Sequence, residues 1–144
     1  MSHTGKCLCG SVSFTLENAP TETGACHCEM CRKWSGGIYL GVAVPPDQIT
    51  FEGAENIGTF KSSDWAERAF CKNCGSSLYY KVTAPGPHQN VHHIGFGTLD
   101  DPSGFTMTEE IFIDKKPAAY GFAGDTKTMT GAEVFAMFAP PPEE

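Results

Sequence analysis

The sequence predicts a mainly β protein with little helix, and two patterns in it favour this fold class. Apolar residues recur in short runs with period two, which is typical of strands that bury one face. Gly, Pro, Asp and Asn separate these runs, and 16 glycines and 10 prolines suit the many turns that short strands need. We therefore expect several short antiparallel strands.

The clearest strand signal lies near the N-terminus, where Val12, Phe14 and Leu16 alternate with Ser13 and Thr15. Other apolar runs are bounded by turn residues in the same way. They predict further strands at residues 38–44, 49–51, 57–61, 68–70, 78–82, 91–96 and 110–113.

Two segments carry helix signals. Residues 29–34 can form one short helical turn. Near the C-terminus, Thr130 and Glu133 have the spacing of a capping box in front of the apolar residues 134–138. The last residues, 140–144, are too rich in Pro and Glu to pack.

Length and charge restrict the classes of protein. The 144 residues suit a single domain over 1–144, with a core at about 5–122 and an extension at about 123–144. A formal net charge of −7 leaves no basic surface for a phosphate backbone, so we expect no nucleic-acid partner. No stretch approaches the roughly 20 apolar residues of a membrane span, and no signal peptide is evident. We expect a cytoplasmic monomer or homodimer without membrane contact.

The seven cysteines give the strongest signal in the sequence. They form three groups, at residues 7–9, 26–31 and 71–74. Without a secretion signal they should stay reduced, and an odd number cannot all pair as disulfides. Metal binding or thiolate chemistry is therefore expected.

Four of these cysteines predict a closed structural zinc site. Cys71 and Cys74 have the spacing of a zinc knuckle, and a glycine follows them. Cys7 and Cys9 can supply the other two sulfurs, because residues two apart in an extended chain share a face. The alternative is that all four are buried cysteines without metal. Sites with four cysteine ligands are a common structural zinc arrangement, which favours the metal.

Cys26, Cys28 and Cys31 predict a second and more open site. Three thiolates leave the fourth position of a zinc ion available to water or substrate, as in catalytic sites. His27 would point away from its two neighbours in an extended chain, which argues against it as the fourth ligand. The alternative for this cluster is a reactive thiol group that oxidises to a disulfide and leaves one cysteine over.

Polar residues follow the three-cysteine cluster directly. Cations at this position can lower thiol pKa values or hold an anionic ligand, and the alternative interpretation is a solvated turn. The candidate substrate-binding residues are Arg32, Lys33, Ser35 and Gly36.

Four stretches together resemble the glutathione-dependent formaldehyde-activating enzyme family, whose zinc-binding β-tent domain also occurs in centromere protein V. They are GKCLCG at residues 5–10, CHCEMCRK at 26–33, RAFCKNCGS at 68–76 and GTLDDP at 97–102. The order and spacing of all seven cysteines agree with this family. The chain departs from the family pattern at Glu110 and Tyr120, where many relatives have histidine and tryptophan.

The resemblance implies two zinc ions per chain, one on each cysteine cluster. It also implies a carbon–sulfur lyase that adds the thiol of glutathione to formaldehyde, giving S-hydroxymethylglutathione, and catalyses the reverse. Cys26, Cys28 and Cys31 would then be the catalytic residues. The alternative function is a non-catalytic zinc module that binds a thiol ligand or a protein partner.

Overall fold

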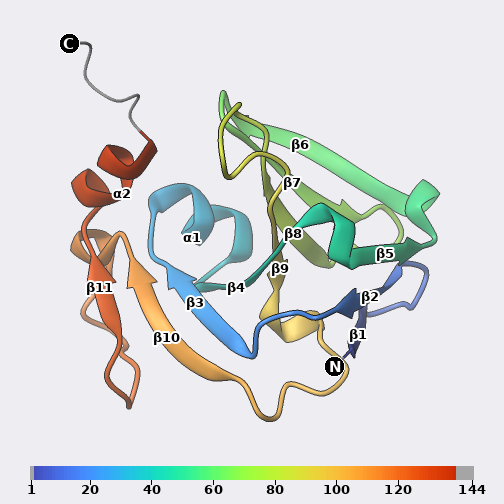
Figure 1. The fold of residues 1–144 in the computed structure, drawn as a ribbon, viewed down its shortest axis with the longest axis horizontal. Helices are drawn as coiled ribbons and strands as arrows, with labels where there is room; N and C mark the ends of the chain where they lie inside the picture. Colours follow the sequence, from blue (N-terminus) through green and yellow to red (C-terminus); the bar gives the residue numbers. More distant parts are fainter. Residues whose placement is uncertain (1, 139–144) are drawn as a thin grey trace. The chain divides into compact units, whose positions relative to one another are not determined.

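The computed structural model describes residues 2–138, and these form mainly β structure (Figure 1). The chain has two compact units, residues 2–23 with 40–106 and residues 24–39 with 107–138. The single domain expected over residues 1–144 stays a prediction. The helices are α1 (Glu29–Ser35) and α2 (Gly131–Phe138), and the strands are β1 (Ser2–Lys6), β2 (Ser13–Glu17), β3 (Glu22–Cys26), β4 (Tyr39–Val44), β5 (Ile49–Glu52), β6 (Ile57–Ser63), β7 (Ala66–Cys71), β8 (Ser77–Val82), β9 (His92–Gly95), β10 (Thr106–Ile111) and β11 (Lys127–Met129).

The first unit contains two antiparallel sheets. One has the strand order β1-β2-β5, and the other runs β4-β9-β8-β7-β6. In the first sheet Phe14 lies opposite Gly5 on one side and Phe51 on the other. The predicted alternation in β2 is confirmed, because Val12, Phe14 and Leu16 are buried at 3% exposure or less. Their side chains pack in one cluster with Val42, Val44, Leu78, Tyr79, Ile94, Leu99, Cys7 and Cys71.

The second unit contains the strand order β3-β10-β11 and both helices. Strands β10 and β11 are parallel, with Glu110 opposite Thr128. Helix α1 begins after Cys28, whose extended backbone and side chain form its N-cap, and it ends at Gly36 in the left-handed region. The unit thus places its three cysteines where a strand gives way to a helix.

The predicted elements agree with the structure at most positions. The strands expected between residues 12 and 96 and the turn of helix at 29–34 are all present. The capping box is confirmed, since Thr130 Oγ1 accepts from the Glu133 amide at 3.2 Å and Glu133 Oε1 accepts from the Thr130 amide at 3.0 Å. Residues 140–144 lie outside the described part of the chain.

One strand boundary was wrong and three strands were missed. The strand expected at residues 110–113 is Thr106–Ile111, because Phe112 has a φ of 56° and turns the chain into a 3-10 turn. The missed strands are β1, β3 and β11. Each is short and carries polar or small residues, and therefore has no period-two apolar pattern to find.

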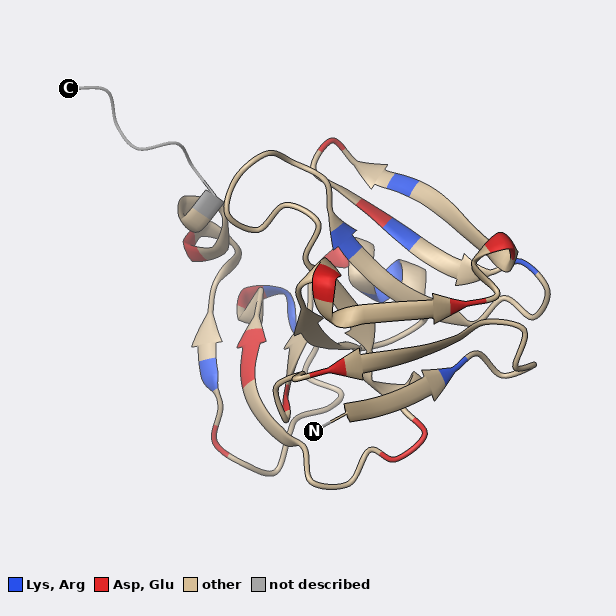
Figure 2. Ribbon diagram, turned by 45° about the vertical axis from the view of Figure 1, so that its right-hand side comes forward, with Lys and Arg blue, Asp and Glu red and all other residues tan. Residues whose placement is uncertain are grey.

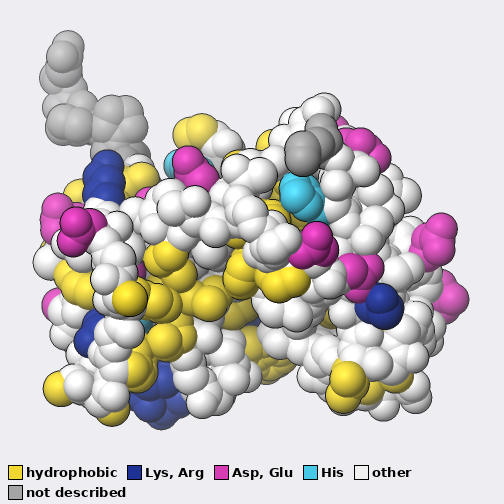
Figure 3. Space-filling view, turned by 90° about the horizontal axis from the view of Figure 1, so that it is seen from below, with side chains coloured by type: hydrophobic (Ala, Val, Ile, Leu, Met, Phe, Trp, Pro, Cys, Tyr) yellow, Lys and Arg dark blue, Asp and Glu magenta, His cyan; other side chains and the backbone are white. Residues whose placement is uncertain are grey.

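Acidic and basic residues lie on strands, helices and turns (Figure 2). The whole chain has 17 acidic residues and 10 basic ones. Hydrophobic side chains also reach the surface (Figure 3). Among the side chains that the structure describes, the large exposed ones are Leu8, Met30, Phe60, Trp65, Phe135 and Met137. Among residues 2–138, no helix has the length and apolar character needed to cross a membrane.

Candidate metal centres

The first cysteine cluster lies in the first unit, where two tight turns meet. Cys7 and Cys9 stand between β1 and β2, while Cys71 ends β7 and Cys74 precedes β8. The four sulfurs lie within 4.8 Å of one another. Cys9 Sγ is 3.6 Å from Cys7 Sγ and 3.8 Å from Cys71 Sγ. Sulfurs this close can bind one metal ion in common.

Both turns end on a glycine with a positive φ. The amide of Gly10 donates to Cys7 O at 3.1 Å, and the amide of Gly75 donates to Cys71 O at 2.8 Å. Their φ values are 80° and 81°, and backbone strain disfavours these values for any residue with a Cβ. The expectation that Cys7 and Cys9 lie in extended chain was wrong, because Leu8 and Cys9 form a turn. The turn still brings the two sulfurs together.

Polar groups that the sequence analysis missed surround this cluster. Asn73 Nδ2 donates to Cys9 Sγ at 3.2 Å, and Ser11 Oγ lies 3.0 Å from the same sulfur. Hydrogen bonds from Ser11, and then from Asn73, lower the pKa of Cys9 to about 7. Ser76, 3.1 Å from Cys74 Sγ, lowers the pKa of that thiol to about 5. These two positions therefore favour the thiolate, which is the form that binds metal.

The second cluster lies in the second unit. Cys26 ends β3, Cys28 caps α1, and Cys31 lies in its first turn. Their sulfurs lie within 4.8 Å of one another. Cys26 and Cys28 are two residues apart in extended chain, and the first turn of α1 brings Cys31 back to them. The amide of Cys31 donates to Cys28 Sγ at 3.2 Å, and the amide of Arg32 donates to Cys28 O at 3.0 Å. The start of the helix thus fixes two of the three sulfurs.

The Cys26 thiol shows why this cluster suits a cation. The nearby sulfurs of Cys28 and Cys31, together with burial, raise the pKa of Cys26. Three thiolates would repel one another without a positive charge between them. A divalent ion supplies that charge, so the donor set fits a metal.

His27 lies between two cysteines but does not belong to the cluster. Its side chain is 0% exposed, and its Nε2 lies 2.8 Å from Glu110 Oε1. The imidazole therefore bonds a carboxylate of β10, and His27 is not among the residues grouped around the three sulfurs.

The residues expected to bind substrate lie on and after α1. Lys33 pairs with Glu29 at 3.0 Å, and both side chains are about two-thirds exposed. Gly36 has a φ of 77° and donates its amide to Arg32 O at 2.8 Å. The side chains of Arg32 and Ser35 are also exposed. A role in substrate binding for these residues stays a prediction.

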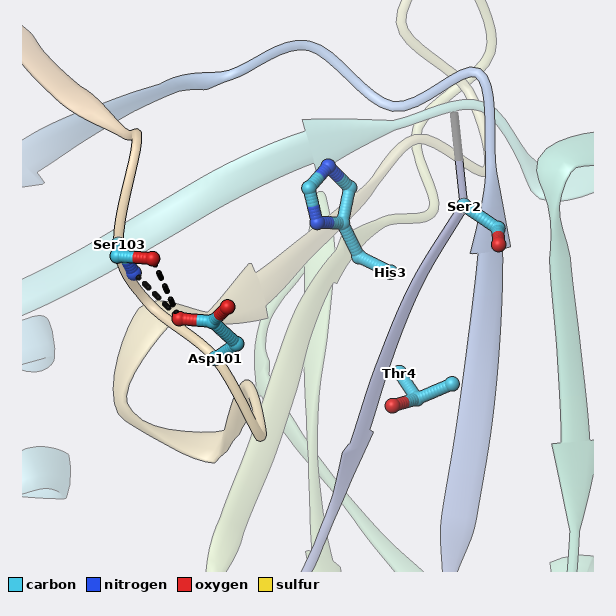
Figure 4. A pocket seen from close by; sticks show the side chains of 5 residues that line it. All are labelled: Ser2, His3, Thr4, Asp101 and Ser103. Atoms are coloured by element: carbon cyan, nitrogen blue, oxygen red, sulfur yellow. Dashed lines mark hydrogen bonds between the residues drawn. The ribbon is translucent and has the colours of Figure 1, made fainter.

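A cavity of about 370 Å³ lies elsewhere in the first unit (Figure 4). It is lined by Ser2, His3, Thr4, Asp101 and Ser103. Asp101 Oδ1 accepts from the amide and the hydroxyl of Ser103 at 3.0 and 2.6 Å. None of the cysteines lines it, so it contributes nothing to thiolate chemistry.

Comparison with known proteins places these clusters in context. The sequence model of the glutathione-dependent formaldehyde-activating enzyme family matches residues 2–115. An uncharacterized lyase of Schizosaccharomyces pombe is 33% identical over 90% of this chain and 92% of its own length. Proteins of Podospora anserina and Penicillium rubens, provisionally named glutathione-dependent formaldehyde-activating enzymes, are 32% and 26% identical over 62% and 67% of this chain. The chain spans 44% and 52% of their lengths.

A solved structure is also similar in fold. The crystal structure of a Rhodobacter sphaeroides protein has a TM-score of 0.55, covering 73% of this chain and 99% of that chain at 20% identity. At this identity the likeness concerns the fold alone.

Proposed function

The chain belongs to the glutathione-dependent formaldehyde-activating enzyme family, and from this we propose that it is a zinc-dependent carbon–sulfur lyase that joins a thiol to an aldehyde. The observation that carries the proposal is the cluster of Cys26, Cys28 and Cys31, which gathers three sulfurs and, among residues 2–138, no fourth His, Cys, Asp or Glu ligand. A lyase name on the S. pombe relative, which this chain covers almost completely, supports the reaction class.

We assign the two clusters different roles. Cys7, Cys9, Cys71 and Cys74 offer the four sulfurs of a closed tetrahedral zinc site, which stabilises the fold. Cys26, Cys28 and Cys31 would hold a second zinc with one position left for a substrate thiol. A zinc there would supply the charge that deprotonates a bound thiol at neutral pH.

The proposed reaction begins with the thiolate of the bound substrate as the nucleophile. Its sulfur attacks the carbonyl carbon of the aldehyde, a carbon–sulfur bond forms, and the carbonyl oxygen takes up a proton to become a hydroxyl. In reverse, the hydroxyl loses its proton and the carbon–sulfur bond breaks. Arg32 and Ser35 follow the cluster directly and are our candidates to donate hydrogen bonds to the developing oxyanion.

The charge of the site favours thiol delivery over water activation. Three thiolates bring a divalent ion to a net charge of about −1, which makes it a weaker Lewis acid than zinc on neutral histidines. The names of the relatives point to glutathione and formaldehyde as the substrates. We propose the same pair here, with S-hydroxymethylglutathione as the product.

The test is a rate measurement on purified, reduced protein with glutathione and formaldehyde. Wild-type protein should accelerate formation of S-hydroxymethylglutathione with saturation in glutathione. Cys28→Ser should lose this activity and one zinc, whereas Met30→Leu, an exposed control on the same helix, should keep both. Saturable glutathione binding without any acceleration by the wild type would instead support the non-catalytic zinc module.

A further inference from the structure

Two hydrogen bonds on Glu110 link it to Thr126 and to His27, and His27 lies between Cys26 and Cys28 of the three-cysteine cluster. His27 Nε2 lies 2.8 Å from Glu110 Oε1, and Thr126 Oγ1 donates to Glu110 Oε2 at 2.6 Å. The His27 and Glu110 side chains are 0% and 9% exposed. Buried polar groups of this kind are costly unless they are satisfied, so their arrangement is well determined.

The protonation state of Glu110 determines which group donates and which accepts in these hydrogen bonds. Burial raises the pKa of Glu110, but the hydrogen bonds from Thr126 and His27 together lower it by more than burial raises it. The pKa of this carboxyl therefore lies below its ordinary value. An ionised carboxylate only accepts hydrogen bonds, and His27 must therefore carry its proton on Nε2. The other ring nitrogen, Nδ1, faces Tyr120 Oη at 3.5 Å.

His27 is tied to β10 at two neighbouring residues. Its amide donates to Ile111 O at 3.1 Å, while its side chain bonds Glu110. The backbone between Cys26 and Cys28 is consequently fixed in position and in rotation. The turn into α1 already fixes Cys28 relative to Cys31. The tie through His27 adds the remaining constraint, which is the position of the Cys26 sulfur relative to that pair.

We infer that Glu110 is a positioning residue for the site of Cys26, Cys28 and Cys31, acting through His27 and supported by Thr126. It holds the three sulfurs in the arrangement that binds the metal, and it does not itself ligate the ion. The inference deepens the proposed function of this cluster and rests on it. The rival explanation is that the buried pair only stabilises the second unit.

Metal retention separates these explanations. Glu110→Ala removes the acceptor for His27, whereas Glu110→Gln keeps its shape and one acceptor oxygen. Val134→Ala is the matched control, because it removes packing from a buried residue of α2 in the same unit and leaves the hydrogen bonds on Glu110 intact. Each reduced, zinc-loaded protein is titrated with a chelator, and the zinc remaining per chain is counted.

The expected result is selective weakening of one zinc. In Glu110→Ala the more easily removed zinc should be lost at a chelator activity up to about 10-fold lower than in the wild type. This is the smallest effect typical of removing a direct partner of a metal ligand, and Glu110 acts one residue further out, through His27. Glu110→Gln should recover most of this difference. The other zinc, and both zinc ions of Val134→Ala, should follow the wild type. Equal zinc loss in Glu110→Ala and Val134→Ala would overturn the inference.

Amide hydrogen exchange gives a second readout that does not depend on metal or activity. Peptides covering residues 26–31 should exchange faster in Glu110→Ala and at wild-type rates in Val134→Ala. Unchanged exchange of this segment in Glu110→Ala would also overturn the inference. A wild-type protein that holds only one zinc would contradict the proposed function. Hydrogen exchange of residues 26–31 would then be the remaining test of whether Glu110 positions this segment.

Discussion

Half-buried His93 shows at the scale of one residue how removal from water alters a titratable group. It lies in β9 with its ring edge-on to Tyr80 at 5.6 Å, opposite that residue in the neighbouring strand. Burial, followed by the charges of His88 and His92, lowers the pKa of His93 to about 4. The folded protein therefore keeps this imidazole neutral at a pH where the unfolded chain protonates it.

The sign of the resulting pH dependence can be predicted. Between pH 6.5 and 4 the unfolded state binds a proton at His93 that the folded state does not, so the free energy of unfolding decreases as pH falls. His93→Gln should reduce this slope by up to about 1.4 kcal/mol per pH unit, because one proton is removed from the balance. Urea unfolding of both proteins at several pH values measures it. Parallel slopes for wild type and variant would contradict the prediction.

At the scale of single elements, the sequence contained most of the signals that the structure uses. The alternation in β2 and the capping box of α2 depend on neighbours in sequence, and both were predicted correctly. Strands β3 and β11 could not be predicted, because each pairs with a strand that is distant in sequence. Both lie beside β10 in the sheet. Local propensity gives no information about such partners.

The candidate sites also contain some features that depend on neighbours in sequence and others that depend on distant residues. Cysteine spacing predicted both clusters, because each spacing directly limits where the sulfurs can lie. Asn73, which reaches Cys9 across 64 positions of sequence, was missed. Glu110, which reaches His27 across 83 positions, was noted only as a departure from the family pattern. No local pattern distinguishes such residues from other Glu or Asn residues of the chain.

The turn between β7 and β8 gives a prediction for a single element. Gly75 has a φ of 81°, and a Cβ there would meet nothing within 4 Å. Gly75→Ala should therefore lower the free energy of unfolding by about 1 kcal/mol through backbone strain alone. Gly97, which also has open space but no positive φ, is the control, and Gly97→Ala should change stability little. Thermal melts of the zinc-loaded proteins decide it, and equal effects of the two variants would exclude strain as the cause.

At the scale of the whole molecule, the two clusters differ in how much chain they join. The first cluster connects Cys9 to Cys71, which are 62 positions apart, and it lies among core residues of the first unit. The second cluster connects six consecutive residues, 26–31. Closing a long loop restricts the unfolded chain more than closing a short one, and only the first cluster joins segments that are distant in sequence. Metal at the first cluster should therefore contribute mainly to folding, and metal at the second mainly to chemistry.

This difference predicts opposite results for two matched substitutions. Cys74→Ser removes a ligand from the long-range site, where zinc contributes on the order of 10 kcal/mol in structural zinc peptides, so the protein should be molten or insoluble. Cys28→Ser removes a ligand from the local site and should stay folded, with about one zinc per chain and without thiol-dependent activity. Cys9→Ser should behave like Cys74→Ser, because both belong to the same cluster. Thermal melts and zinc counts of the three reduced variants measure the difference. If Cys28→Ser unfolds while Cys74→Ser remains native, the structural and catalytic roles have been assigned to the wrong clusters.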